Sequence, residues 1–290
     1  MSLSRAGTPV RASNNPQEPP HASNLPGWRT LAALSLGLAA LGAQAALVQV
    51  KVTVENLVPA NGISFAPMHV GFGNGSFDAF NLGGVATAPI ISVAEGGSAS
   101  AWFPAFAAAE PGSTRGTIAF APLQPGDLFM NTFTVDSTAN RFFTFASMVV
   151  PSNDFFVGND DSMQYALFGA DGNLQTASIT VKAGEIWDAG SEAFDPANAA
   201  FVVGGNNDLR TPQNGLVNFN FAELAGFNGL TTATGYVLDS QLGAQDDILR
   251  FTFAVQAVPE PGTYALTLVG LAALGFTARR RRQAGTPSAT

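Results

Sequence analysis

The sequence predicts an all-β fold, an antiparallel β-sandwich, over residues 46–257 of a 290-residue chain. Three observations lead to this prediction. Short apolar runs alternate with polar residues at a period of two, which places one face of each strand in a core. Glycine-rich turns separate the runs. The chain has twenty-three phenylalanines and no cysteines, so a packed apolar core rather than disulfides must stabilise the domain.

The expected strands follow one another along this region. The first is the clearest, because its four valines alternate with polar residues from 48 to 54, and the last covers 248–255 with the same alternation. Residues 221–224 are the one helical alternative, and Trp102, Phe103 and Phe106 have an alternation suited to core packing. Between the first and last strands, further strands are expected at 128–135, 142–150, 164–168, 174–182 and 217–221, and turns at 74–75, 83–84, 96–97, 171–173 and 204–205.

Residues 1–45 are expected to be an N-terminal extension and a secretory signal peptide. Arg29 precedes the apolar stretch 31–41, and Ala43-Gln44-Ala45 follows as an A-x-A site for a signal peptidase. The charge, the apolar core and the small-residue site come in the order that a signal peptide requires. This order favours a signal peptide cleaved after Ala45 over the alternative of a buried helix. The mature protein is then expected to be exported across the inner membrane.

Residues 258–283 form a tripartite tail. Val258-Pro259-Glu260-Pro261 comes first, an apolar run over 263–278 follows, and Arg279, Arg280, Arg281 and Arg282 close it. This order resembles the PEP-CTERM sorting signal of Gram-negative bacteria, which a membrane-embedded protease, an exosortase, recognises and cuts near the motif. The alternative is a plain C-terminal membrane anchor. Residues 284–290 are expected to be a disordered tail.

The apolar run predicts one transmembrane helix. Its sixteen residues, at ~1.5 Å rise each, span roughly 24 Å, a little less than the ~30 Å hydrocarbon core. Tyr264 and Arg279 can extend this length at the two interfaces. The arginine cluster places the C-terminus in the cytoplasm, so the folded domain is expected on the periplasmic side, membrane-anchored transiently before it reaches the cell surface.

The domain is strongly acidic. Residues 46–257 contain six Lys or Arg and nineteen Asp or Glu, a net charge of −13. Because phosphate binding needs a cationic surface, this charge argues against nucleic acid as a partner. It is compatible with divalent cations.

Two segments concentrate the polar residues that could carry chemistry. In 148–158 and in 187–192, a hydrophobic strand runs into a loop with carboxylates. Asp188 and Glu192 are four residues apart across a turn, and Asp154 joins them if the two strands are neighbours. Close carboxylates repel one another unless they are protonated or neutralised, and Ca²⁺ is the common hard cation outside the cell. The alternative is a set of ordinary solvated loop acids.

Residues 148–158 resemble the V-P-S-x-D-W-F-V-G signature of the spondin domain, and 187–192 is similar to that family's W/Y-D-A-G-T-D/E motif. The resemblance implies an antiparallel, C2-like β-sandwich whose loops bind calcium, with Asp154, Asp188 and Glu192 as ligands. Phe155 replaces the Trp of the family, and Glu192 stands where animal members tend to have Asp. A looser upstream match covers Phe65-Ala66-Pro67 with His69, Phe77-Asp78-Ala79-Phe80 and Ala94-Glu95-Gly96-Gly97.

The remaining ionisable candidates are expected to be structural. Asp160 and Asp161 either add ligands or add only local negative potential, and the second is favoured. Asp246 and Asp247 are expected to form a solvated turn. A Ser-His-Asp hydrolase would have to use His69, the domain's only histidine, but no G-x-S-x-G nucleophile elbow occurs. A structural role is therefore expected for His69.

The expected function is that of an exported, surface-sorted, calcium-binding recognition or adhesion module without enzymatic activity. Its expected partners are the exosortase-type protease and an extracellular glycan or matrix component, within exopolysaccharide or biofilm matrix. Two alternatives stay open. One is a structural matrix protein without calcium dependence, and the other is a secreted hydrolase.

Overall fold

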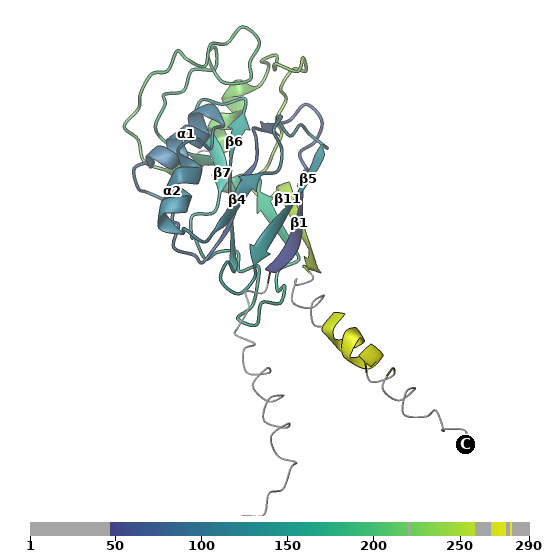
Figure 1. Cartoon of the computed structure of the whole chain (residues 1–290). Coiled ribbons are helices and arrows are strands. Elements are labelled where there is room, and N and C mark those ends of the chain that lie inside the picture. Colours follow the sequence, from purple (N-terminus) through teal and green to yellow (C-terminus); the bar gives the residue numbers. More distant parts are fainter. Residues whose placement is uncertain (1–46, 220, 259–267, 277–278, 280–290) are drawn as a thin grey trace, which may run out of the picture. The chain divides into compact units, whose positions relative to one another are not determined.

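The computed structural model describes residues 47–219, 221–258, 268–276 and 279 (Figure 1). Two antiparallel sheets form the body of the domain, and two short α-helices lie against one of them. In chain order the elements are β1 (Leu47–Asn56), β2 (Ser64–Phe65), β3 (His69–Gly73), α1 (Ala88–Gly96), α2 (Trp102–Ala109), β4 (Thr114–Thr117), β5 (Leu128–Asp136), β6 (Phe142–Val150), β7 (Phe155–Gly158), β8 (Ser178–Lys182), η1 (Ala183–Glu185), β9 (Trp187–Asp188), β10 (Asn218–Phe219), η2 (Phe221–Phe227) and β11 (Asp247–Ala257).

The four-stranded sheet joins the first and last strands of the domain. Its order is β5-β1-β11-β8, with antiparallel neighbours throughout. The pairing of β1 with β11 runs from Val48 opposite Ala257 to Asn56 opposite Leu249. Along β1 the valines at 50, 52 and 54 are fully buried and the residues between them are more exposed, so the predicted period of two is confirmed.

The seven-stranded sheet has the order β10-β9-β7-β6-β3-β4, with β2 paired to β6. It packs on the first sheet through aromatic side chains. Phe143 of β6 has ring-centroid distances of 5.3 Å to Phe251 and 4.9 Å to Phe253, both on β11. Burying one Phe side chain stabilises a fold by roughly 1.5–3 kcal/mol, so a core of such rings can hold two sheets together without disulfides. The arrangement is consistent with the predicted β-sandwich.

The predicted strands and turns are confirmed in most places. β5 and β6 match the predicted strands at 128–135 and 142–150. The helical alternative at 221–224 is realised as the 3₁₀ helix η2. Three predicted strands are shorter than expected: 164–168 forms single β-bridges only, 174–182 narrows to β8, and 217–221 narrows to β10. Each predicted turn contains a glycine with positive φ, namely Gly75, Gly83, Gly97, Gly172 and Gly204.

The prediction of strands throughout is wrong for residues 88–109, which contain α1 and α2. Trp102 and Phe106 are four residues apart and both buried, which is the spacing of a helix face rather than of a strand. Pro89 in the first turn of α1 and Gly97 after its end, with φ 59°, mark the limits of that helix. The helices add a third layer, because their apolar side chains form a second core with Phe156 and Trp187 of the seven-stranded sheet.

α2 approaches β3 closely because β3 carries glycines on the facing side. A Cβ on Gly71 would lie 1.8 Å from the Phe106 ring, and a Cβ on Gly73 would lie 1.9 Å from the Glu110 carboxylate. Phe72, which alternates with them, belongs to the core between the sheets. Glycines two residues apart thus open one face of the strand to a helix while the other face stays packed.

Glu110 directly follows α2 and fixes the turn after β3. Its Oε1 accepts the backbone N–H groups of Ser76 and Phe77, each at 2.7 Å, and its Oε2 accepts that of Asn74 at 2.5 Å. The carboxylate is buried, so these charge-assisted hydrogen bonds replace its hydration. The sequence analysis did not single out Glu110, because its partners lie more than thirty residues earlier in the chain.

The sequence-predicted export segments lie largely outside the described residues. Residues 268–276 are helical, and within the part of the chain that the structure describes no helix has the length and apolar character needed to cross a membrane. The transmembrane run at 263–278 continues beyond those residues and stays a prediction. Also outside the described residues are the signal peptide with Ala43 and Ala45, the motif residues 259–261, the arginines 280–282 and the tail 284–290.

Replacing Gly71 by alanine should destabilise the domain by about 1–3 kcal/mol, because the Phe106 ring must move away from β3. Gly112→Ala is the matched control, since a Cβ at Gly112 meets no atom within 4 Å. Urea unfolding of the full-length chains, followed by tryptophan fluorescence, measures both changes. Equal unfolding midpoints for the two variants would contradict the close packing of α2 on β3.

Candidate functional site

The two segments that carry the predicted acids are neighbours in the seven-stranded sheet. β7 pairs with β9 so that Phe155 lies opposite Asp188 and Phe156 lies opposite Trp187. Asp154 directly precedes β7, and the turn that leads to Glu192 directly follows β9. The register therefore meets the condition on which the sequence analysis placed Asp154 beside Asp188.

Asp154 is buried and holds the turn after β9. Its Oδ2 accepts the N–H groups of Ser191 at 2.7 Å and Glu192 at 2.9 Å, and the Ser191 hydroxyl at 3.2 Å. Asp188 Oδ1 accepts the N–H of Gly190 at 2.6 Å within the same turn. The two carboxylates together therefore fix the conformation of residues 189–192.

Gly190 is required by this turn for two reasons. Its φ is 64°, a left-handed conformation that favours glycine. A Cβ at this position would also lie 2.8 Å from the backbone of Gly215. The glycine of the D-A-G segment thus allows 189–193 to lie against 211–215.

Ionising Asp154 is unfavourable in this environment. The pKa of Asp154 is raised to about 7, chiefly by burial and further by the charge of Asp188, while the hydrogen bonds from Glu192 and Ser191 oppose the increase. The loss of hydration outweighs the donors that favour the carboxylate. Near neutral pH, Asp154 therefore takes up a proton more readily than an ordinary aspartate does.

Glu192 belongs to a different group of charges. Its Oε1 accepts Nδ2 of Asn153 at 3.2 Å, and its Oε2 lies 3.8 Å from Nε of Arg210. Arg210 also pairs with Glu95, at 2.9 Å. Burial raises the pKa of Glu192, while the hydrogen bond from Asn153 lowers it. Its Oε2 is buried and accepts no hydrogen bond from the described residues.

The predicted set of three calcium ligands is not assembled in full. Across the described ranges, no group of three or more His, Cys, Asp or Glu side chains could hold a metal ion. Asp154 and Asp188 offer the oxygen ligands and the paired negative charge that suit Ca²⁺, whereas Glu192 is engaged with Asn153 and Arg210. Calcium binding by Asp154 and Asp188 therefore stays a prediction.

The other acids considered from the sequence stabilise turns or pair on the surface. Asp247 forms an exposed ion pair with Lys182 at 3.0 Å. Asp160, Asp161 and Asp246 each accept one backbone N–H group at 2.8–2.9 Å, from Leu82, Met163 and Gly243 respectively. These contacts give all four acids a local structural role.

His69 begins β3 and both of its ring nitrogens are hydrogen-bonded. Nε2 lies 3.0 Å from the carbonyl oxygen of Gly97, and Nδ1 lies 3.0 Å from Oγ1 of Thr117. Because a carbonyl can only accept, Nε2 carries the proton and Nδ1 accepts the Thr117 hydroxyl. Burial lowers the pKa of His69, although the bond to Gly97 opposes the decrease. These contacts give His69 the structural role that was expected of it.

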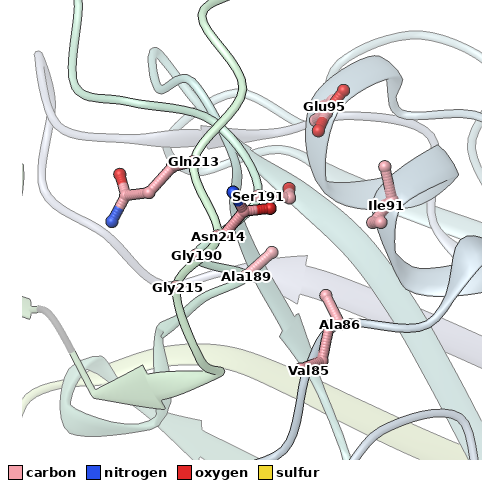
Figure 2. Close-up of a pocket in the computed structure, with 10 residues that line it drawn as sticks. All are labelled: Val85, Ala86, Ile91, Glu95, Ala189, Gly190, Ser191, Gln213, Asn214 and Gly215. Atoms are coloured by element: carbon pink, nitrogen blue, oxygen red, sulfur yellow. The ribbon is translucent and has the colours of Figure 1, made fainter.

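A cavity of about 240 Å³ lies beside the β9 turn (Figure 2). Residues 189–191 and 213–215 form one wall and are held together by the Gly215 N–H, which donates to the Gly190 carbonyl at 2.8 Å. Val85, Ala86, Ile91 and Glu95 contribute the other side. The sequence analysis missed this cavity, because Ile91 and Glu95 reach it from α1, a helix that was not predicted.

The C-terminal segment gives the destination of the protein. β11 ends at Ala257, and the next residue, Val258, donates its N–H to the carbonyl of Leu47 at 3.4 Å. Residues 257–282 match the PEP-CTERM protein-sorting motif. The match confirms the sorting tail predicted at 258–283. It indicates that the protein is secreted, processed by an exosortase and sorted to the cell surface or extracellular space.

The body of the domain has no such match. No spondin-domain model matches the chain, so the spondin resemblance stays a prediction. No curated protein matches the sequence either. The activity of the domain must therefore be inferred from its own residues.

Asp154→Asn should flatten the pH dependence of stability between about pH 4 and 7. Folding raises the pKa of Asp154 from 3.8 to about 7, so its stabilising contribution is complete below the unfolded value and is lost as the pH rises through the folded one. The free energy of unfolding of the wild type should fall relative to that of the variant by up to ~1.4 kcal/mol per pH unit.

Urea unfolding of both full-length chains, in the presence of a chelator, measures this difference. A difference that is constant or that increases with pH would mean that Ser191 and Glu192 keep Asp154 ionised throughout.

His69 should titrate below its ordinary pKa of 6.5. As the pH falls, His69 of the unfolded chain is protonated at a higher pH than His69 of the folded chain. The contribution of His69 to stability is therefore present above pH 6.5 and is lost as the pH falls below it. NMR titration of the imidazole protons measures the pKa directly. The chain has two histidines, and the His69→Gln spectrum identifies which signal belongs to His69. A pKa at or above 6.5 would contradict a His69 ring that is buried and hydrogen-bonded at both nitrogens.

Proposed function

We propose that the domain is a non-enzymatic recognition or adhesion module that works outside the cell, with Ca²⁺ held by Asp154 and Asp188. The buried pair of acids on neighbouring strands carries this proposal. Burial chiefly, and the charge of Asp188 in addition, raise the pKa of Asp154, and a divalent cation would compensate for both effects. The similarity of both loops to spondin motifs supports the same two ligands.

The strand β1 separates the start of the sorting segment from the strand pair that precedes the acidic loop. The matched sorting segment begins at Ala257, which pairs with Val48 at one end of β1. Asn56, at the other end of β1, donates to the carbonyl of Ile63 at 3.1 Å, and the following residue, Ser64, pairs with Val150 just before the acidic loop. A strand of ten residues is roughly 33 Å long, so the two ends of β1 lie about that far apart.

Calcium is proposed to order the turn that carries recognition rather than to take part in chemistry. Asp154 already holds the N–H groups of Ser191 and Glu192, and a bound cation would keep it ionised in that position. Stabilisation then follows from mass action, since the cation binds only the folded turn. We expect weak affinity, on the order of 10⁻⁴–10⁻³ M, as in other extracellular calcium modules.

The partner proposed for the module is a glycan or another component of the extracellular matrix. Sorting to the cell surface places the domain where such polymers occur. Binding is favoured over hydrolysis because both nitrogens of His69 are engaged by Thr117 and Gly97, which leaves no ring nitrogen to activate a nucleophile.

Adding about 10 mM calcium should raise the melting temperature of the full-length chain. With the affinity above, the gain is about 1.4–2.7 kcal/mol, which corresponds to a shift on the order of 5 °C for a domain of this size. Asp188→Asn should abolish the shift. Asp208→Asn, a change at an exposed aspartate outside the site, should leave it intact. Differential scanning calorimetry measures all three chains.

The shift should also be larger at pH 8 than at pH 6, because calcium competes with the proton of Asp154. If Asp188→Asn keeps the full shift, or if no chain responds to calcium, the ligand assignment is wrong.

A further inference from the structure

We propose that the cavity between α1 and the β9 turn binds one neutral sugar residue, at the end or on a branch of an extracellular polysaccharide. The inference rests on the proposed recognition function and gives it a ligand class and a location. It is carried by the lining of the cavity, by its size and by the charge around it.

The lining is apolar on one side and polar on the other. Figure 2 shows Ile91 and Ala86 across the cavity from the oxygen atoms of Ser191 and Asn214. A sugar ring has the same two characters, with C–H groups on its faces and hydroxyls at its edge. Sites of this kind use apolar walls for burial and a few convergent polar groups for orientation.

The Asn214 side chain is available for such a ligand. Its amide forms no hydrogen bond with any other described residue, and the residue is exposed. An amide offers both a donor and an acceptor, which suits adjacent hydroxyls. The Ser191 hydroxyl donates to Asp154 at 3.2 Å, so its lone pairs can accept a hydroxyl from the ligand.

The volume limits the ligand to a single ring. The cavity measures about 240 Å³, below the roughly 300–1,000 Å³ of sites that bury drug-sized molecules. A polysaccharide can therefore enter only through one residue at a chain end or on a branch.

The charge favours a neutral sugar over an acidic one. Glu95 lines the cavity, Asp154 accepts hydrogen bonds from Ser191, and Glu192 follows Ser191 in the turn. Arg210, the nearest cation, is already shared between Glu95 and Glu192. A uronic acid would meet net repulsion, in keeping with a domain charge of −13 over residues 46–257.

Ser191 connects the cavity to the acid pair. Its backbone N–H and its hydroxyl both contact Asp154 Oδ2, at 2.7 and 3.2 Å, while Ser191 also lines the cavity. A cation that fixes Asp154 would fix the position of this hydroxyl as well. Calcium should therefore strengthen sugar binding without touching the sugar.

Surface plasmon resonance of the full-length chain in a mild detergent tests the proposal. The probes are an immobilised glucan, galactan and mannan, with a polyuronate for comparison. We expect binding to at least one neutral polymer and none to the polyuronate. Asn214→Ala should weaken that binding about tenfold, the effect of losing one or two hydrogen bonds. Gln49→Ala is the matched control, because it removes an exposed amide from β1 in the other sheet.

Two results would overturn this inference: no binding to any neutral polymer, or binding that Asn214→Ala and Gln49→Ala leave equally strong. The second would leave the recognition function standing and move its site elsewhere. Asp188→Asn separates the calcium assignment from the cavity. If Asp188→Asn binds the polymer but no longer responds to calcium, both the sugar site and the calcium assignment stand. If Asn214→Ala weakens binding while calcium has no effect on any chain, the sugar site stands and the calcium assignment is wrong.

Discussion

The buried carboxylate of Asp154 is the constraint on which the distal end of this domain depends. One of its oxygens receives two backbone N–H groups and a hydroxyl from the turn after β9. The turn places Ser191 at the cavity and Glu192 beside Asn153 and Arg210. A single acid next to β7 thus sets the geometry of two different polar groups on the neighbouring strand.

Comparison with Glu110 shows why Asp154 is the unusual acid. Both are buried carboxylates that accept three hydrogen bonds from a turn. Glu110 spreads its donors over both oxygens, whereas Asp154 gathers them on one oxygen and has the charge of Asp188 close by. Hydrogen bonds from amides can replace water around a lone acid, but they do not remove the repulsion between two acids. Glu110 therefore serves as a structural clamp, whereas Asp154 is the acid on which the proposed function depends.

The sequence was sufficient for features that depend on local patterning. Alternating valines predicted β1, and glycines predicted the turns, because strand periodicity and positive φ are properties of short segments. The helices were missed because Trp102, Phe103 and Phe106 were assigned to core packing, and their helical spacing was not recognised. The closeness of Asp154 and Asp188 could be predicted, because each lies beside or at the end of a strand and the two strands are neighbours. The closeness of Arg210 and Glu95 could not, because tertiary folding brings them together from 115 positions apart.

The pairing of the first and last strands determines how the domain would carry mechanical load. A pull on the sorting tail enters β11 at Ala257 and acts along that strand, which is flanked by β1 and β8. Nine residue pairs join β11 to β1, and a force along the strands loads them all at once rather than one after another. A domain pulled through this end therefore shares the force among nine residue pairs, so that the two strands are not peeled apart one pair at a time.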